Sequence, residues 1–144
     1  HKGKTKAQIL AEKNSGWRIL LVEQNPIIPR EGHDETIQDR KRLEANQTPS
    51  EYLQTIGQGI YQHESGQTPE DWLTQAITQL TETNQVLDDW QGKGSIAYLT
   101  GAYFPASGGV AAARWNRDRR QADLDRSGPG KRGPSVGARS AVRV

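Results

Sequence analysis

Hydrophobic positions recur with helical spacing in two segments near the middle of the chain. In the first, Tyr52, Leu53, Ile56 and Ile60 fall on one face of a helix that would end near Gly66. The second extends to about residue 90, and its apolar face is formed by Trp72, Leu73, Ala76, Ile77, Leu80 and Leu87. The pattern predicts two helices that pack as an antiparallel hairpin spanning residues 48–90.

Each of these helices begins with the same short motif. Residues 47–53 read QTPSEYL and residues 67–73 read QTPEDWL. In both copies a threonine, Thr48 or Thr68, is placed to cap the helix, and proline follows at the first helical position, where its missing N–H costs nothing. An acid three residues after the threonine completes a capping box. Local chemistry therefore predicts both helix starts.

Two further segments have the character of strands. Residues 17–22 form a nearly continuous apolar run, which predicts a strand with both faces at least partly covered. Residues 95–104 predict a strand, or a hairpin that bends at Gly101. Between them, residues 33–46 have a helical composition with few apolar positions, and we expect a solvated helix that Asp34 caps.

The C-terminal quarter is rich in arginine. From Val110 to about Asp125, small apolar residues followed by several arginines predict a helix, and the Ser, Gly, Pro and Arg beyond Arg126 lack periodicity. We therefore predict an α+β, helix-dominated fold. A helical hairpin would pack on a small sheet from residues 17–23 and 95–104, and an extended basic C-terminal arm would leave the body. Residues 1–112 would form the folded body, and residues 113–144 the Arg-rich helix and the arm.

Composition limits the kind of protein this can be. With 144 residues, 33% of them hydrophobic, and a mean hydropathy of −0.85, the chain is one domain with a small core. The absence of cysteine excludes disulfides, thiolate zinc sites and cysteine nucleophiles, and fits a reducing compartment. No apolar run approaches the roughly 18 residues of a membrane span, and no signal peptide is visible. We expect a cytoplasmic or virion protein with no membrane partner and no cofactor.

Charge is segregated along the chain. No Lys or Arg occurs between Arg42 and Lys93, whereas residues 113–144 carry nine cations and three acids. Arginine forks fit phosphate and Trp115 could stack on a base, which favours nucleic acid. Basic arms also bind acidic protein surfaces, including the region 43–92 of a second copy, so both partners stay open. The candidate binding residues are Arg114, Trp115, Arg117, Arg119, Arg120, Arg126, Lys131, Arg132, Arg139 and Arg143.

A short motif at the N-terminus suggests different chemistry. Residues 2–5 read KGKT and run into a short helical segment, after which residues 17–23 read WRILLVE. This resembles the phosphate-binding start of the partition-type ATPases with a deviant Walker motif, in which a GKT sequence caps a helix that leads to an LLVD-like strand. The resemblance implies that Lys4 would contact a phosphate and Thr5 a magnesium ion.

The function that these features favour is structural. We expect a non-enzymatic subunit of a large assembly, such as a phage particle or a nucleoprotein complex, whose arm contacts neighbouring subunits or nucleic acid. One alternative is a stand-alone nucleic-acid-binding accessory protein, and another is a fragment of a partition-type P-loop ATPase. We predict neither catalytic nor metal-ligating residues, because the three histidines lack the spacing that places two ligands on one helical face. Deleting residues 127–144 is expected to leave a folded body.

Overall fold

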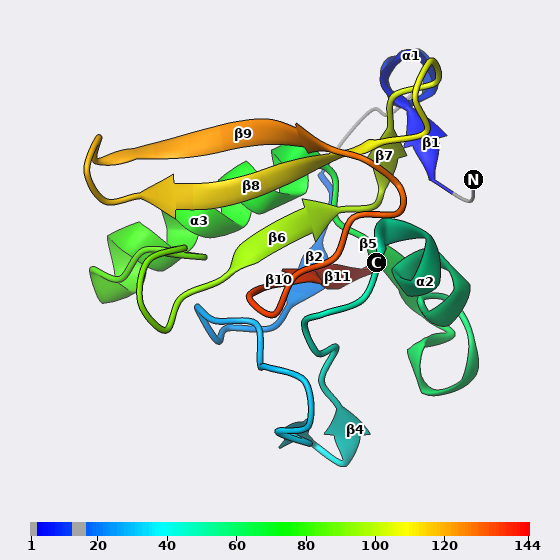
Figure 1. Cartoon of the computed structure of the whole chain (residues 1–144). Helices are drawn as coiled ribbons and strands as arrows, with labels where there is room; N and C mark the ends of the chain where they lie inside the picture. The colour runs from blue at the N-terminus through cyan, green and yellow to red at the C-terminus, as the bar shows by residue number, and fades with distance from the viewer. Residues whose placement is uncertain (1–2, 13–16) are drawn as a thin grey trace.

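The computed structural model describes residues 3–12 and 17–144, and this part of the chain is rich in sheet (Figure 1). Its helices are α1 (Lys6–Ala11), α2 (Pro49–Thr55) and α3 (Pro69–Thr83), with a 3₁₀ turn, η1, at Gly59–Tyr61. Its strands are β1 (Lys4–Thr5), β2 (Leu20–Val22), β3 (Thr36–Ile37), β4 (Arg40–Lys41), β5 (Glu64–Gly66), β6 (Ile96–Leu99), β7 (Ala102–Tyr103), β8 (Val110–Asn116), β9 (Gln121–Ser127), β10 (Val136–Ala138) and β11 (Ser140–Arg143). The fold is α+β as predicted, but the prediction that helices dominate it is wrong.

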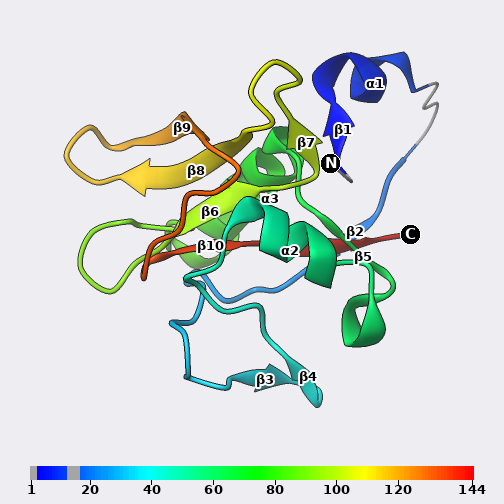
Figure 2. The ribbon, with the colours of Figure 1, turned by 45° about the vertical axis from the view of Figure 1, so that its right-hand side comes forward.

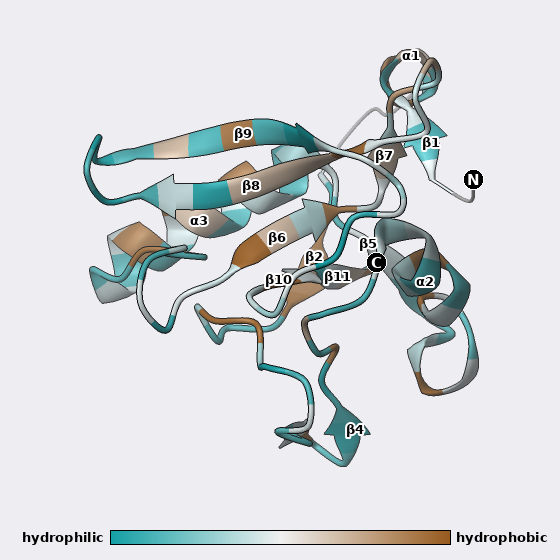
Figure 3. Ribbon diagram, viewed as in Figure 1, coloured by the Kyte–Doolittle hydropathy of each residue, from teal (hydrophilic) through white to brown (hydrophobic). Residues whose placement is uncertain are grey.

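A four-stranded sheet forms the centre of the molecule, in the order β10-β6-β8-β9. Strands β6, β8 and β9 are antiparallel neighbours, and β10 joins β6 in parallel. Figure 3 shows hydrophobic colours on β6 and mostly hydrophilic ones along β9, as expected for a central strand and an edge strand. The sheet is therefore buried at its centre and exposed at β9.

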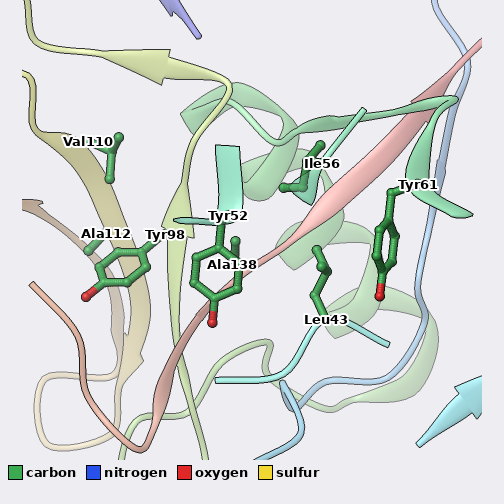
Figure 4. Close-up of a cluster of buried hydrophobic side chains, with 8 residues drawn as sticks. All are labelled: Leu43, Tyr52, Ile56, Tyr61, Tyr98, Val110, Ala112 and Ala138. Atoms are coloured by element: carbon green, nitrogen blue, oxygen red, sulfur yellow. The ribbon is translucent and has the colours of Figure 1, made fainter. Parts of the chain in front are cut away.

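One face of this sheet packs under α2. Tyr98 of β6 and Val110 and Ala112 of β8 share a cluster with Tyr52 and Ile56 from α2 and its C-terminal end (Figure 4). The rings of Tyr52 and Tyr98 lie 6.3 Å apart at an angle of 58°, a favourable tilted arrangement.

The opposite face packs under α3. Ala97 and Leu99, which alternate with Tyr98 along β6, lie with Ala113 in a second cluster that contains Trp72 and Leu87. The two capped helices thus cover opposite faces of one sheet, and the predicted helical hairpin is wrong. The prediction assumed that the apolar faces of the two helices pack against each other. Each helix instead packs against its own face of the sheet.

The predicted helix starts are confirmed. The hydroxyl of Thr48 accepts the backbone N–H of Glu51 at 3.2 Å, and that of Thr68 accepts the N–H of Asp71 at 3.3 Å. Each acid side chain in turn accepts the backbone N–H of its threonine, which completes both capping boxes. Both helix ends come earlier than predicted, because a different local structure follows each helix. The chain turns at Gly57 with φ +84° after α2, and Asn84 takes the left-handed conformation, with φ +55°, after α3.

The predicted Arg-rich helix is instead the hairpin of β8 and β9. The carboxamide oxygen of Asn116 accepts the backbone N–H groups of Asp118 and Arg119 at 3.1 and 3.2 Å, which forms the turn, and Arg120 has φ +52°. Successive residues Ala112 and Ala113 are buried against different cores, so both faces of this segment are covered. A strand satisfies that requirement, and tertiary packing overrides the helical propensity of alanine.

The predicted extended arm is also wrong, because the C-terminal residues are strands in two sheets (Figure 2). Strand β11 is the middle strand of an antiparallel sheet, β2-β11-β5, with Val142 opposite Leu21 and Ala141 opposite Ser65. Strand β10 belongs to the large sheet, and Arg139 alone separates β10 from β11. The chain therefore passes from one sheet to the other at Arg139.

The other strand predictions fare differently. A strand within residues 17–22 is confirmed as β2, and a strand within residues 95–104 is confirmed as β6. The alternative of a hairpin bent at Gly101 is wrong, because β6 and β7 pair with other strands, and the predicted sheet from residues 17–23 and 95–104 is wrong, because β2 lies in a different sheet from β6 and β7. Residues 33–46 contain the small hairpin β3–β4 in place of the predicted helix. Gln38 and Asp39 form its turn with φ +49° and +64°, a backbone that a right-handed helix cannot contain.

Candidate partner-binding site on the β2–β11–β5 sheet

Most of the predicted cationic binding residues are ion-paired within the chain. Five of the nine cations contact an acid: Arg114 with Asp125, Arg117 with Asp89, Arg132 with Glu51, Arg139 with Asp88, and Arg143 with Asp71. The acids lie on β9, near the N-termini of α2 and α3, and in the segment after α3. The charge segregation seen along the sequence is thus largely neutralised in the folded protein.

Arg139 is the most buried of these cations. Its Nε and Nη2 donate to the two carboxylate oxygens of Asp88, each at 2.8 Å. The same carboxylate also accepts Trp72 Nε1 at 2.8 Å and Ser95 Oγ at 2.7 Å. Arg139 Nη1 donates to the carbonyl of Asn25 at 3.1 Å. This side chain is therefore fixed by Asp88 and Asn25 at the point where the chain passes between the two sheets, and it is inaccessible to a partner.

Trp115 is half-buried beside α3. It lines an apolar pocket of about 90 Å³ with Trp72, Leu73, Ile77 and Leu87. The ring therefore belongs to the wall of this apolar pocket beside α3, and the expected role of stacking on a base stays a prediction.

The four remaining cations are exposed and spread out. No acid lies within salt-bridge distance of Arg119, Arg120, Arg126 or Lys131 in the part of the chain that the structure describes. Arg119 and Arg120 lie at the β8–β9 turn, whereas Arg126 lies near the other end of β9. Arg126 lies six positions after Arg120 along extended strand, a distance of roughly 20 Å. The structure does not gather these four residues into one patch.

The residues of the KGKT motif have local roles. Thr5 Oγ1 accepts the backbone N–H of Gln8 at 3.1 Å and so caps α1, a helix of six residues. Lys4 Nζ pairs with Glu12, and Lys4 and Thr5 form β1, which pairs in parallel with β7. Lys2, the first residue of the motif, lies outside the described residues. In this geometry Thr5 caps the start of α1, and the Lys4 side chain pairs with Glu12, the residue that follows the end of α1.

Exposed apolar side chains gather instead on β2 and β11. The exposed fraction is 57% for Leu21, 58% for Ile19 and 78% for Val144, and Trp17 is fully exposed. Leu21 lies opposite Val142, and the Val144 N–H donates to the Ile19 carbonyl at 3.1 Å, so Ile19, Leu21, Val142 and Val144 share one face. We call these four residues together with Trp17 the apolar face. The sequence predicts a strand with both faces at least partly covered, and on this face Ile19 and Leu21 are more than half exposed.

A hollow of about 510 Å³ lies next to this face. Leu21 and Val142 line it on the sheet side, and Ile37 lines it from the β3–β4 hairpin. We call this space the sheet hollow. Its charged wall consists of Arg40, Glu64 and Glu23, so the hollow combines apolar side chains with a compact ionic cluster.

The ionic cluster is internally satisfied. Arg40 pairs with Glu64 and, through Nη1, with Glu23 at 2.7 Å, while Arg42 Nε donates to Glu23 at 2.8 Å. Burial raises the pKa of Glu23, but the hydrogen bonds from Arg42 and Arg40 outweigh it and hold that pKa below its ordinary value. Ser140 Oγ donates to Glu64 and is therefore held by an acceptor. The cluster therefore fixes the charged wall of the hollow with side chains that are paired to one another.

These residues are not among the binding residues predicted from the sequence. The signal was present as an alternation of apolar residues at positions 17, 19 and 21 and again at positions 142 and 144. Nothing local shows that the two ends of the chain pair with each other, because that pairing spans more than 120 residues.

Comparisons with protein-family models, with curated proteins and with solved structures find no match to this chain. Within the described residues, no group of three or more His, Cys, Asp or Glu side chains is placed to hold a metal ion. Across the same residues, no helix has both the length and the apolar character needed to cross a bilayer.

Proposed function

We propose that this protein is a non-enzymatic subunit of a larger assembly and that its apolar face binds a neighbouring protein subunit. The observation that carries the proposal is the exposure of Trp17, Ile19, Leu21 and Val144 around one strand pair. Single exposed apolar residues are common on folded proteins, but contiguous ones mark contact surfaces. The proposal keeps the assembly function expected from the sequence and moves the contact from the basic C-terminal residues to β2 and β11.

The energetics favour a partner at this face. Burying a side chain such as leucine or isoleucine is worth about 1.5–3 kcal/mol, and an interfacial tryptophan is the residue type most often dominant in binding. The sheet hollow gives a partner side chain a place to enter beside Leu21 and Val142. Its ionic wall is already paired, so a partner need not separate these charges in order to bind.

The ion pairs also make nucleic acid a less suitable partner than the sequence indicated. Binding to a phosphate backbone depends on several simultaneous cation contacts. Five of the candidate cations are committed to acids of this chain, and Arg126 lies far along β9 from the turn that carries Arg119 and Arg120. These features support a protein partner.

Site-specific photo-crosslinking tests this proposal. A photoreactive benzoylphenylalanine replaces Ile19 in one variant and Arg119 in another, and each is irradiated in the cells that produce the protein. We expect a discrete protein adduct from position 19 and none from position 119. Adducts from position 119 alone, or adducts that nuclease treatment removes, would overturn the proposal.

A pair of charge substitutions supplies an independent measurement. Leu21→Lys places a cation in the apolar face, and Leu124→Lys makes the same change at a leucine of β9 that is 47% exposed. Both variants should fold, because neither leucine is buried. We expect Leu21→Lys to stop co-sedimentation with the assembly and Leu124→Lys to leave it unchanged; equal behaviour of the two variants contradicts the proposal.

A further inference from the structure

Among the strands that the structure describes, β2 pairs with β11 alone, so one edge of β2 is unpaired. In the sheet order β2-β11-β5, β2 is an edge strand, and β11 lies along only one of its two sides. Hydrogen-bonded and non-hydrogen-bonded pairs alternate in an antiparallel ladder. Ile19 is hydrogen-bonded to Val144, so Leu21 is the next residue whose backbone N–H and C=O groups are directed at β11. The N–H and C=O groups of Leu20 and Val22 therefore point away from β11. Within the described residues, no hydrogen bond satisfies those outward groups.

The outward edge faces a groove beside α3. This space of about 520 Å³ has the backbone segment Leu20–Val22 along one side and a polar wall of α3, including Thr74, Thr78 and Glu82, along the other. We call it the α3 groove. A strand added to a sheet lies about 4.8 Å from its neighbour, and a run of unpaired N–H and C=O groups is a template for such a strand.

The side chains of the α3 groove indicate what kind of segment fits. Of the described residues that line it, none is Lys or Arg, whereas Asp71 and Glu82 both belong to it. Asp71 is already paired with Arg143, and Glu82 has no ion-pair partner in the described part of the chain. Thr74 and Thr78 donate their hydroxyls to carbonyls of α3 itself, at 2.8 and 2.9 Å. The unsatisfied chemistry is therefore a row of backbone groups and an acidic side chain.

We propose that the α3 groove receives an extended segment of a partner protein, which adds as a strand to β2 and directs basic side chains at α3. This inference rests on the proposed function, since it specifies how the partner engages the same strand. Main-chain hydrogen bonds to Leu20 and Val22 supply affinity, and alternate side chains meet the apolar face and the α3 wall.

A single segment fits this edge better than a second copy of the chain. In a symmetric dimer the two β2 edges would pair with each other, and each would bring its own α3 to the same seam. A lone strand has no such flanking helix. The proposed occupant of the α3 groove is therefore an extended segment of a partner protein. The test must also be able to detect pairing between two copies of the chain.

The test uses the full chain and a displayed library of random nine-residue peptides as the probe. Peptides selected on the wild type are measured against Leu20→Pro, which removes an outward N–H together with the leucine side chain. It leaves the hydrogen bonds to β11 in place, and proline is tolerated on that side of an edge strand. We expect selected peptides to contain Lys or Arg and to bind Leu20→Pro at least tenfold more weakly. The same peptides, N-methylated at alternate residues, should also lose at least tenfold, a result that does not depend on how the variant folds.

Three outcomes overturn this inference: no peptide is selected, binding is unchanged by Leu20→Pro and by N-methylation, or sedimentation shows a dimer that Leu20→Pro dissociates. Failure of the inference remains separate from failure of the proposed function. Crosslinks from position 19 together with peptides indifferent to Leu20→Pro would retain the partner at the apolar face and reject strand addition. An absence of crosslinks at position 19 would reject the proposed function itself.

Discussion

Arg139 and Asp88 form a buried ion pair with two parallel hydrogen bonds, at the single residue that separates β10 from β11. Asp88 has φ +51° and so lies in the left-handed region, where the surrounding contacts must hold it. Its carboxylate accepts four hydrogen bonds, from Arg139, Trp72 and Ser95. The pair therefore connects α3, the start of β6 and the crossing between the two sheets.

Removing the charge of Asp88 should destabilise the protein strongly. Breaking one side of a buried ion pair leaves an uncompensated charge, so we expect Asp88→Asn to lower the free energy of unfolding by about 3–5 kcal/mol in urea titrations. Asp39→Asn is a matched control, because Asp39 is exposed and also has a positive φ, +64°. That control should change stability by less than about 0.5 kcal/mol. Similar small effects from both substitutions would show that the Arg139–Asp88 pair does not stabilise the passage of the chain from β10 to β11.

Glycine substitutions distinguish the β8–β9 hairpin from the helix that composition predicts. Arg120 has φ +52°, so Arg120→Gly should be neutral or should stabilise by up to about 1 kcal/mol, because glycine adopts that conformation without strain. Arg119→Gly, one residue earlier and without a positive φ, should destabilise the protein through lost chain entropy alone. Thermal unfolding of the two variants checks the order. In a helix both substitutions would cost about the same, close to 1 kcal/mol.

Capping motifs were the part of this fold that the sequence predicted best. Thr48 and Thr68 act within four residues of themselves, so the chemistry that starts α2 and α3 is present in the sequence. Where those helices pack is not local, and neither helix motif indicates that the large sheet lies between them. The alanines after Val110 likewise favour a helix by local propensity. They form a strand because both faces of this segment are buried, in two different clusters.

The candidate site was harder to predict for a related reason. Charge along the chain drew attention to residues 114–143, but the acids that neutralise Arg117, Arg132 and Arg139 lie in distant segments. The ionic partners of a cation are set by tertiary structure, whereas a charge run is a property of composition. The apolar face could be predicted only as a strand with exposed alternating positions, and its pairing with β11 joins opposite ends of the chain.

The ionic cluster beside the sheet hollow makes stability dependent on pH. The pKa of Glu23 is lower in the folded protein than its ordinary value of 4.5, because Arg42 and Arg40 favour the carboxylate more than burial disfavours it. The stabilisation is therefore fully present above about pH 4.5 and is lost as the pH falls through the lower folded pKa. We expect the free energy of unfolding to fall less steeply between pH 5.5 and 3.5 in Glu23→Gln than in the wild type. Parallel pH profiles would contradict this role for Glu23.

Truncation at the C-terminus tests whether β11 belongs to the folded body. Among the described strands, β2 and β5 pair with β11 and with no other strand. A chain that ends at Arg139 should therefore lose the small sheet and its cooperative unfolding transition, followed by circular dichroism. A chain that ends at Arg143 lacks only the last residue and should unfold like the wild type. A cooperative transition in the shorter chain, at wild-type stability, would restore the view of these residues as a detachable arm.

Residue-resolved amide hydrogen exchange tests the central claim most directly, namely that β11 is an inner strand and that the far edge of β2 is open for a partner. The Leu21 N–H is directed at β11, whereas those of Leu20 and Val22 point into the α3 groove. On the isolated full chain, we expect slow exchange at Leu21 and Val142 and fast exchange at Leu20 and Val22. Equal protection at Leu20, Leu21 and Val22, or no protection at Leu21 and Val142, would contradict the account.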